Sequence, residues 1–550
     1  MIRFFSQFSL VEKLLLIAIF IVYTHNLFID IMYVDAAQYS GLSSQMAYTN
    51  SYLEVKDFDN DYLDKPPLLF WLSSLSIKVF GINNFAYKLP TFLFLLISIY
   101  AVYRFSILYY CQKIAQNAVL ILASAQAYFL MTNDVRTDGL LTSSVIISVW
   151  LFAEYFEKRS FKNLVYAAIF IAFALMSKGP IGIIAVLLPI GLHLIYLKKW
   201  QFIFSFNWLL VVFIVAVLLL PMSYGLYTQF DLHPEKITNG TKGQSGLYFY
   251  YWLQSFGRIT GENSWNNFKP WHFFITSSLW DFFPWFLPLL FAVFYKLKGL
   301  FFQNSKAIEI ISLSGFVIIF FMFSLSKYKL PHYVFVTFPF AAVLVAEYFY
   351  KINETSWKNW RIFFIILSFI ILLLLIIYNL FFFTEINFLA VILIILQICI
   401  IYSYFKFNKN NVAQLIILVI MLNVFMSFVF YPKLLTFQSD SVAAKYANKY
   451  LNVQNVYIYN SPSYSFNFYT KKPFVDIIDK AKIKDINNTF WLYLSDQDLL
   501  DLQDLKLNIT KKIQFDDYPI TRLKINFLLS KKREQELKHK FLIKIENNHK

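Results

Sequence analysis

The sequence predicts a polytopic α-helical membrane protein that carries a small C-terminal α/β domain. The 550 residues are 58% hydrophobic, 20% aromatic and only 15% charged, whereas a soluble globular chain is about 25% charged. Apolar runs of roughly 18 or more residues recur along most of the chain, which is the length a helix needs to cross a bilayer. A helix also satisfies its own backbone hydrogen bonds, as lipid requires.

Thirteen segments are predicted to span the bilayer, and the loops between them alternate in character. One set of loops is short and basic, and the other holds the unusual polar motifs. The positive-inside rule places the basic set in the cytoplasm and the polar set outside, including the long loops 34–88 and 227–271. The predicted spans are 14–33, 90–109, 115–131, 138–155, 163–177, 180–197, 204–225, 272–294, 307–325, 332–350, 362–383, 387–405 and 412–431.

The chain is therefore expected to divide into a transmembrane domain, 1–433, and a soluble domain, 434–550. An odd number of spans puts the soluble domain on the extracytoplasmic (periplasmic) side of the plasma (inner) membrane, together with the polar loops. It holds no compelling catalytic pattern and is expected to pack on the membrane half or to shape access to it. Its predicted strands are 455–460, 474–478, 489–494 and 520–527, and its predicted helices are 439–451 and 531–544.

The net charge of +16 does not indicate a nucleic-acid partner. The basic residues lie mainly in short loops and in the tail, where membrane topology and anionic headgroups account for them. Cys111 and Cys399 lie at or inside apolar segments, so they predict neither a disulfide framework nor a metal site. The first apolar run lacks a cleavage pattern and is expected to be a retained helix.

The first outer loop opens on Asp35, directly after the first predicted span. A carboxylate at the bilayer edge can act as a general base, a metal ligand or the partner of a buried cation, and it can equally be a solvated helix cap. Further along the loop, Asp57, Asp59 and Asp61 alternate in DFDNDYLD. The glycine and closing glutamate of a calcium loop are missing, so these three are expected to face solvent.

The same loop ends in Asp64-Lys65-Pro66-Pro67. The two prolines stiffen the chain beside the charged pair. A lysine held at the lipid interface can bind a phosphate as a point charge. A lysine that snorkels to the interface is the equally weighted alternative.

Three more polar side chains lie next to predicted spans. Asp138 opens the span 138–155, where it can cap the helix, or join a site if the first outer loop folds over this helix end. Lys178, in Met-Ser-Lys-Gly-Pro, is predicted to be a snorkelling cation in a turn. Arg258 follows the amphipathic run YFYYWLQSFG, and it suits either a bidentate phosphate contact or a solvated position at the headgroups.

The segment SKYKLPHY joins two predicted spans on the outer side. It holds Lys327, Lys329, His332 and Tyr333, a dense group of phosphate-compatible donors. The alternative is an ordinary basic turn. That alternative is weakened because the positive-inside rule makes lysines rare on the outer face.

Together these segments resemble the ArnT-like GT-C membrane glycosyltransferases, within the wider protein O-mannosyltransferase-like family. The resemblance covers the chain up to about Pro432, and order, spacing and side of the membrane make it specific. It implies a GT-C fold with about 13 transmembrane helices. The segments that carry it are VDAAQYSGLSSQM, YLDKPPLLFWL, RTDGLLTSSVIISVWLF, MSKGPIGI and SKYKLPHYVFVTFPFAA.

The resemblance implies inverting transfer of a sugar from a polyprenyl-phosphate carrier to a lipid A-like or other envelope acceptor, on the outer face of the plasma membrane. It assigns catalytic roles to Asp35 and Asp138. It implies no certain cofactor; for a divalent metal ion, Asp64 is one ligand and His272 a speculative second. The implied donor-phosphate residues are Lys65, Arg258, Lys329 and Tyr333, and the implied substrate-pocket residues are Gln38, Tyr39, Lys327 and His332.

The chain departs from the family pattern in its outer loops. Ala36 stands where the family often has Glu, and Gln38 stands where ArnT-like members usually have Arg. Asn266 or Asn267 lies near the place of an expected His. These differences leave the sugar and the acceptor open. Three alternatives remain. One is protein glycosylation of the O-mannosyltransferase kind, and another is a non-enzymatic lipid-carrier transporter or flippase, although no clear internal repeat of the transporter kind is seen. The third is a structural scaffold that organises an envelope complex.

Overall fold

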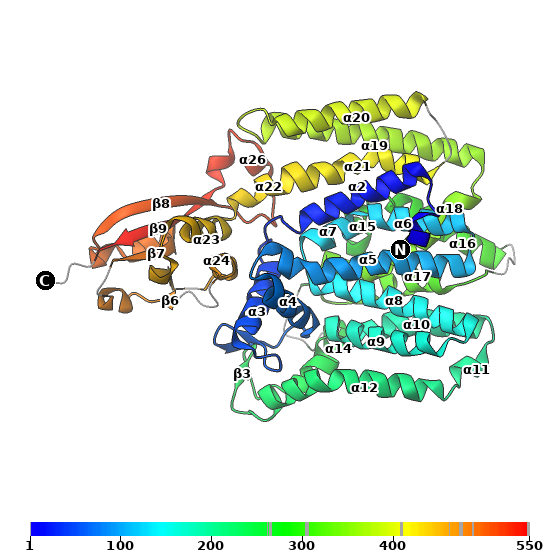
Figure 1. Cartoon of the computed structure of the whole chain (residues 1–550), viewed down its shortest axis with the longest axis horizontal. Helices are drawn as coiled ribbons and strands as arrows, with labels where there is room; N and C mark the ends of the chain where they lie inside the picture. The colour runs from blue at the N-terminus through cyan, green and yellow to red at the C-terminus, as the bar shows by residue number, and fades with distance from the viewer. Residues whose placement is uncertain are drawn as a thin grey trace.

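The computed structural model describes residues 2–260, 262, 267–302, 307–406, 411–460, 462–471, 477–486 and 489–546. A bundle of long helices makes up most of the molecule, and a β-sheet lies beyond one end of it (Figure 1). The larger bundle helices are α2 Leu10–Asn26, α5 Asn84–Tyr109, α6 Gln112–Ser124, α7 Gln126–Asn133, α8 Thr137–Lys158, α9 Phe161–Lys178, α10 Ile181–Tyr196, α12 Asn207–Leu226, α15 Phe273–Asp281, α16 Phe286–Phe302, α17 Ile311–Leu325, α18 Phe338–Lys351, α19 Glu354–Phe381, α20 Phe388–Lys406 and α21 Val412–Phe425.

The bundle has the length and composition of a membrane domain. In the described part of the chain, eight helices are long and apolar enough to cross a bilayer, or up to ten if each of two bent pairs counts as one span. Three further apolar helices are shorter: Leu68–Phe80, Ile181–Tyr196 and Ile311–Leu325. The chain is thus a polytopic helical membrane protein, and the finer number of thirteen spans stays a prediction.

Two predicted spans, 115–131 and 272–294, are each broken into two helices, and hydrogen bonds join the two breaks. The axis bends by 51° between α6 and α7 and by 117° between α15 and α16. The backbone N–H of Gln126 donates to the carbonyl of Phe283 across the breaks, at 3.1 Å. The indole Nε1 of Trp285 donates to Oγ of Ser124 at 2.9 Å. Non-helical backbone at membrane depth is tolerated where protein groups satisfy it, as they do here.

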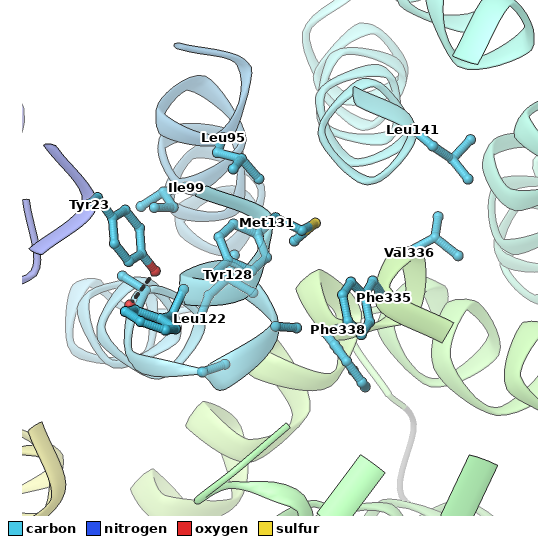
Figure 2. Close-up of a cluster of buried hydrophobic side chains, with 14 of the residues drawn as sticks. Tyr23, Leu95, Ile99, Leu122, Tyr128, Met131, Leu141, Phe335, Val336 and Phe338 are labelled. Carbon is cyan, nitrogen blue, oxygen red and sulfur yellow. Dashed lines mark hydrogen bonds between the residues drawn. The ribbon is translucent and has the colours of Figure 1, made fainter. Parts of the chain in front are cut away.

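The centre of the bundle is a continuous apolar core (Figure 2). In it, the hydroxyl of Tyr23 in α2 donates to the carbonyl of Ala123 in α6 at 2.6 Å. A 3₁₀ segment, η3 (Pro331–Thr337), packs against α8 and buries Phe335 and Val336 in this core. Because η3 also carries two of the predicted site residues, burial of its other side chains fixes where those residues lie.

The turn between α9 and α10 is held by close packing at glycine. Gly179 in this turn has φ +83°, a conformation that favours glycine. Three residues further on, a Cβ on Gly182 would lie 2.7 Å from the carbonyl carbon of Ala174 in α9. The two helices can approach this closely only because Gly182 has no side chain, and this contact fixes the end of α9.

The first outer loop folds into α3 (Asp35–Thr49), a short hairpin of β1 (Lys56–Asp57) and β2 (Asn60–Asp61), and α4 (Leu68–Phe80). Helices α3 and α4 pack on each other. Figure 1 shows them at the end of the bundle that faces the C-terminal sheet, opposite the N-terminus.

The aspartates of this loop were expected to face solvent, and for two of them that prediction is wrong. Asp57 accepts a hydrogen bond from the hydroxyl of Tyr464 at 2.7 Å. Asp61 forms an ion pair with Lys236 at 2.8 Å. Asp59, by contrast, is exposed. The prediction failed for Asp57 and Asp61 because their partners lie in distant parts of the chain, where the local sequence does not reveal them.

The C-terminal part contains a five-stranded mixed sheet with strand order β6-β5-β7-β9-β8. Strand β5 pairs in parallel with β6 and β7, and β9 pairs antiparallel with β7 and β8. The strands are β5 Val456–Tyr459, β6 Ile477–Ile478, β7 Phe490–Ser495, β8 Ile509–Asp517 and β9 Lys538–Ile545; helices α23 (Ser439–Tyr450) and α24 (Tyr464–Thr470) accompany them.

Two predicted elements of this part are wrong. The predicted strand 520–527 is mostly irregular and runs into a short helix, α26 (Ile525–Leu528). The predicted helix 531–544 holds a 3₁₀ turn and most of β9. Because β9 lies between two partner strands, it buries Phe541, Leu542 and Ile543. Pairing on both sides outweighs the helical preference of a Lys- and Glu-rich sequence.

The C-terminal part clamps the chain just before Asp35. The backbone N–H of Tyr33 donates to Oε1 of Gln438 at 2.8 Å, and Nε2 of Gln438 donates to the carbonyl of Ile31 at 2.9 Å. The backbone N–H of Ile31 donates to the hydroxyl of Tyr469 at 2.7 Å. Gln438 and Tyr469 therefore both hold the backbone that leads into α3. The domain boundary between residues 433 and 434 stays a prediction.

We predict that Gly182→Ala lowers the stability of the purified chain in detergent. A methyl group at this position forces α9 and α10 apart, a packing conflict that typically costs about 1–3 kcal/mol. Thermal unfolding should show the loss. Gly191→Ala is the matched control, since its Cβ would have no neighbour within 4 Å, and it should leave the melting temperature unchanged or raised. Equal melting temperatures for the two variants would contradict the packing argument.

Candidate functional site

A polar cavity of about 660 Å³ lies where the first outer loop, the helical bundle and the C-terminal part meet. Most of the residues predicted to form a site line it, and they come from segments far apart in the sequence. The lining residues are Asp35, Gln38, Tyr39, Asp64, Lys65, Arg136, Asp138, Asn267, Tyr328, Leu330, His332, Tyr333 and Arg522.

Arg136 joins two carboxylates at the edge of the cavity. Its Nη1 donates to Oδ2 of Asp35 at 2.6 Å, and its Nη2 lies 2.8 Å from Oδ2 of Asp134. Asp35 opens α3, where the helix dipole favours an anion. Burial alone would lower the pKa of Arg136, but Asp134 and Asp35 outweigh it and raise that pKa. A permanently charged guanidinium therefore holds the start of α3 to the start of α8.

Asp138 and Lys178 form a buried ion pair beneath the cavity. The ammonium of Lys178 contacts Oδ1 of Asp138, and both side chains are less than a tenth exposed. The same ammonium lies 3.9 Å from the ring centroid of Tyr333, a cation–π contact. The prediction that Lys178 snorkels is therefore wrong, because buried charge needs a partner and Asp138 supplies one.

His332 connects the two groups of charges. Nη1 of Arg136 lies 3.4 Å from Nδ1 of His332. Arginine has no acceptor, so Nδ1 must accept and the proton of a neutral imidazole lies on Nε2. That Nε2 is 3.7 Å from Oδ2 of Asp138. The imidazole thus lies between the Asp35–Arg136 pair and the Asp138–Lys178 pair.

Asp64 and Lys65 line the cavity as a pair. Nζ of Lys65 lies 2.8 Å from both carboxylate oxygens of Asp64. This geometry is that of an ion pair. It does not fit the prediction that Asp64 is a metal ligand, because its carboxylate oxygens face the ammonium of Lys65 and a ligand's oxygens would face the metal ion. His272, the speculative second ligand, does not line the cavity. Across the described ranges, no group of three or more His, Cys, Asp or Glu side chains is placed to hold a metal ion.

Two other predicted residues, Lys329 and Lys327, do not line the cavity. Lys329 is buried, which lowers its pKa, and its Nζ donates to the carbonyls of residues 269 and 270. Lys327 is exposed and donates to the carbonyl of Thr260 at 2.7 Å. Both lysines hold the segment before η3 to the long loop and do not line the predicted pocket. Arg258 falls in α14 (Phe256–Thr260), and its side chain lies outside the described residues.

An apolar groove adjoins the polar cavity and shares Lys65 and Tyr333 with it. It runs between α10, α17 and residues 254–256 of the long loop. A polar cavity joined to such a groove can hold one molecule that has a charged head and an apolar tail. The groove is lined by Lys65, Lys178, Ile181, Ile184, Gln254, Ser255, Phe256, Met322, Phe323, Ser326 and Tyr333.

Comparisons with known proteins point to one group. Residues 64–224 match the family described as dolichyl-phosphate-mannose-protein mannosyltransferase. An undecaprenyl phosphate-alpha-4-amino-4-deoxy-L-arabinose arabinosyl transferase of Wigglesworthia glossinidia brevipalpis is 25% identical over 339 residues, which are 60% of this chain and 57% of that protein. An uncharacterized protein of Aquifex aeolicus is 23% identical over 366 residues, 64% of this chain and 66% of that protein. The chain thus matches less than two thirds of the length of either relative.

The fold comparison covers nearly the whole chain. The crystal structure of ArnT from Cupriavidus metallidurans bound to undecaprenyl phosphate has a TM-score of 0.74 with this structure, at 14% identity, over 96% of this chain and 97% of that one. This chain has the same fold as that protein. The predicted resemblance is thereby confirmed, and the two proteins share their arrangement of helices.

The motifs of the ArnT-like chain did not reveal every residue at the site. Arg136 and Arg522 were not predicted as site residues, and Lys178 was predicted to face the interface. Arg136 lies two residues before Asp138 in the RTD motif, so its position was available as a signal. Its partner Asp35 lies 101 residues away, and no local pattern predicts that pairing.

We predict that Lys178→Met destabilises the ArnT-like chain strongly. The substitution leaves the Asp138 carboxylate buried without its cation, which typically costs about 3–5 kcal/mol. Adding Asp138→Asn should recover part of the loss, because the remaining polar group is then uncharged. Unfolding of the purified single and double variants measures both effects.

The exposed pair Lys199–Glu157 is the control for this experiment, since its side chains are 28% and 34% exposed. Lys199→Met should cost less than about 1 kcal/mol. Equal losses in Lys178→Met and Lys199→Met, or a double variant that loses the full sum of the single losses, would show that the buried pair is not coupled.

Proposed function

We propose that this ArnT-like chain is a glycosyltransferase. It moves a sugar, with inversion, from a polyprenyl-phosphate carrier to a lipid A-like or other envelope acceptor at the outer face of the plasma membrane. The observation that carries the proposal is that Asp35, Lys65, Asp138 and Tyr333 line one cavity, which is joined to an apolar groove. A scaffold protein has no need to gather these side chains from four segments.

The groove and the cavity together suit the donor. The apolar side chains of the groove suit a section of an isoprenoid chain, and the proposal puts the carrier phosphate where groove and cavity meet, at Lys65 and Tyr333. Lys178 lines the same end of the groove. Negative charge builds on the carrier phosphate as the glycosidic bond breaks, so fixed cations stabilise the transition state more than the ground state.

The transfer itself needs little covalent chemistry from the protein. The bond between the sugar C1 and the carrier phosphate breaks, and its electron pair goes to the phosphate oxygen. The acceptor oxygen forms the new bond from the opposite face, which inverts the centre. Asp35 takes the proton of a hydroxyl acceptor or, with a phosphate acceptor, orients that group and stabilises positive charge on the sugar. Arg136 holds the carboxylate in place.

The comparisons support the class of donor. The relative from Wigglesworthia is named for undecaprenyl phosphate-linked aminoarabinose, and the similar solved structure holds undecaprenyl phosphate. The identity of the sugar that this chain transfers does not follow from these relatives, since Gln38 stands where ArnT-like members usually have Arg. In this structure Gln38 donates to Asp57 at 2.9 Å and to Tyr464 at 3.1 Å, so it builds the cavity wall.

The other two alternatives make different demands on the structure. Protein glycosylation of the O-mannosyltransferase kind is distinguished by the acceptor that gains mass, so the same assay tests it. A transporter or flippase is expected to place polar binding groups near the bilayer midplane. Here the polar cavity lies where the bundle meets the outer loop and the C-terminal part, which favours the transferase.

We predict that Asp35→Asn and Lys65→Ala each lower kcat/KM for sugar transfer by about 100-fold or more, because each removes a charge that acts in the transition state. The assay uses the purified full chain, an undecaprenyl-phosphate-linked sugar and an extract of envelope lipids and glycoproteins. Mass spectrometry identifies the acceptor that gains the sugar.

Asp59→Asn and Lys56→Ala are matched controls from the same loop, since both side chains are exposed and away from the cavity, and both should keep full activity. Full activity of Asp35→Asn and Lys65→Ala would overturn the site assignment. Labelled protein with no labelled lipid would establish the protein-glycosylation alternative.

A further inference from the structure

His332 differs from the other charged and polar groups of the polar cavity because an imidazole changes its charge near neutral pH. It is the second residue of η3 and lines the cavity, and its side chain is 15% exposed. Its ring packs edge to face against Tyr333, with centroids 5.4 Å apart. An imidazole ordinarily gains or loses its proton between about pH 5 and 8, a range in which ordinary carboxylates, lysines and arginines keep their charge.

Among the described residues, the Arg136 guanidinium has three polar partners, and His332 is the third. Nε donates to Oδ2 of Asp134 at 2.9 Å, and Nη2 lies 2.8 Å from the same oxygen. Nη1 donates to Oδ2 of Asp35 at 2.6 Å. Nη1 carries a second hydrogen, and Nδ1 of His332 lies 3.4 Å away. Because arginine can only donate, this contact requires a lone pair on Nδ1.

The other ring nitrogen faces the buried ion pair. With Nδ1 unprotonated, the proton of the neutral ring lies on Nε2, which is 3.7 Å from Oδ2 of Asp138. Oδ1 of that carboxylate already contacts Lys178. The neutral ring thus presents an acceptor to one pair and a donor to the other. A second proton would convert Nδ1 into a donor that faces Nη1 of Arg136, and it would add a positive charge beside the guanidinium.

The helices packed around η3 bring few further ionisable groups to the cavity. Those with the most extensive packing on η3 are α8, α15, α17 and α18. Helix α17 has no ionisable side chain. The ionisable side chains within residues 154–158 of α8, Asp281 of α15 and those within residues 347–351 of α18 do not line the cavity. Arg136 and Asp138, at the two ring nitrogens, are the charged groups through which the ring can act on the site.

We propose that neutral His332 is a positioning residue for sugar transfer. Its Nδ1 fixes the Arg136 guanidinium, and the guanidinium fixes the Asp35 carboxylate that orients or deprotonates the acceptor. Protonation of the ring removes this support, so transfer requires the neutral form. The inference rests on the proposed transferase function and adds to it a residue that acts through Arg136.

The exposure of the Asp35–Arg136 pair shows why it needs this support. The side chains of Asp35 and Arg136 are 39% and 21% exposed, so close packing alone does not hold them. A displacement of about 1 Å at a reacting group can lower a rate by about 100-fold. Loss of the His332 contact is therefore expected to slow transfer while the protein stays folded.

Two substitutions separate the hydrogen bonds of His332 from its charge. The amide of glutamine can accept from Arg136 and donate to Asp138, and it does not titrate. Leucine offers neither hydrogen bond. At about pH 8, where an imidazole is ordinarily neutral, we expect His332→Leu to lower kcat/KM by about 10- to 100-fold. His332→Gln should keep a larger share of the activity than His332→Leu.

The pH profile of kcat/KM tests the role of the charge. The assay uses the purified full chain, an undecaprenyl-phosphate-linked sugar and an extract of envelope lipids and glycoproteins, from about pH 5 to pH 9. As the pH falls and the imidazole takes up its second proton, the wild-type chain should lose about tenfold in kcat/KM per pH unit. His332→Gln should lack this acid limb.

His233→Gln is the matched control, because His233 is 46% exposed, pairs with Glu235 and does not line the cavity; it should keep the wild-type profile. An acid limb in His332→Gln equal to that of wild type would overturn the proposal, as would equal losses in the glutamine and leucine variants. A wild-type chain that transfers no sugar at any pH would instead overturn the proposed function.

A measurement without donor or acceptor tests the ring directly. Nitrogen-15 NMR of the purified full chain, labelled at histidine, reports which ring nitrogens carry a proton. The signal that is missing in His332→Gln identifies His332 among the seven histidines of the chain. At about pH 8, Nδ1 should be unprotonated and Nε2 protonated. A proton on Nδ1 under these conditions would contradict the proposal whatever the activity of the chain.

Discussion

The Arg136 guanidinium is the interaction on which the rest of the site depends. It holds the first turn of α3, through Asp35, against the start of α8, which carries Asp138. Without it, Asp35 and Asp134 would lose the cation that they share at the edge of the bundle. Because Arg136 also contacts Asp134, one side chain sets the positions of carboxylates from two segments of the chain.

The C-terminal part is a structural component of the site. It fixes the chain before α3 through Gln438 and Tyr469, and it contributes Arg522 to the cavity wall. The bundle itself supplies the partners of Asp35 and Asp138, whereas the backbone just before α3 is held by groups of the C-terminal part. The latter groups account for hydrogen bonds that join residues some 400 positions apart, such as Tyr33 with Gln438, 405 residues away.

Sequence reasoning located the residues whose signal is local. Asp35 follows an apolar run and Lys65 precedes two prolines, so local sequence made both of them candidates, and the family resemblance then gave them their expected roles. Lys178 was misplaced because its partner Asp138 lies 40 residues away, and a lysine at a helix end usually reaches the interface. The same limit explains the fold errors. Strand β9 depends on two partner strands, and the broken spans depend on contacts such as the hydrogen bond from Gln126 to Phe283.

The charges of the site are arranged in a way that separates two tasks. Near the groove, Lys65 pairs with Asp64 and Lys178 pairs with Asp138, so this part of the site is close to neutral. Under the proposed function, a carrier phosphate has to draw an ammonium partly away from Asp64 or Asp138. Such a site binds the phosphodiester of the ground state weakly. It stabilises the transition state more, because further negative charge then develops on the phosphate. Arg522, which lines the same polar cavity, forms no ion pair with a carboxylate in the described chain. It is suited to holding a permanent anion throughout a reaction, a task that differs from receiving charge as a bond breaks.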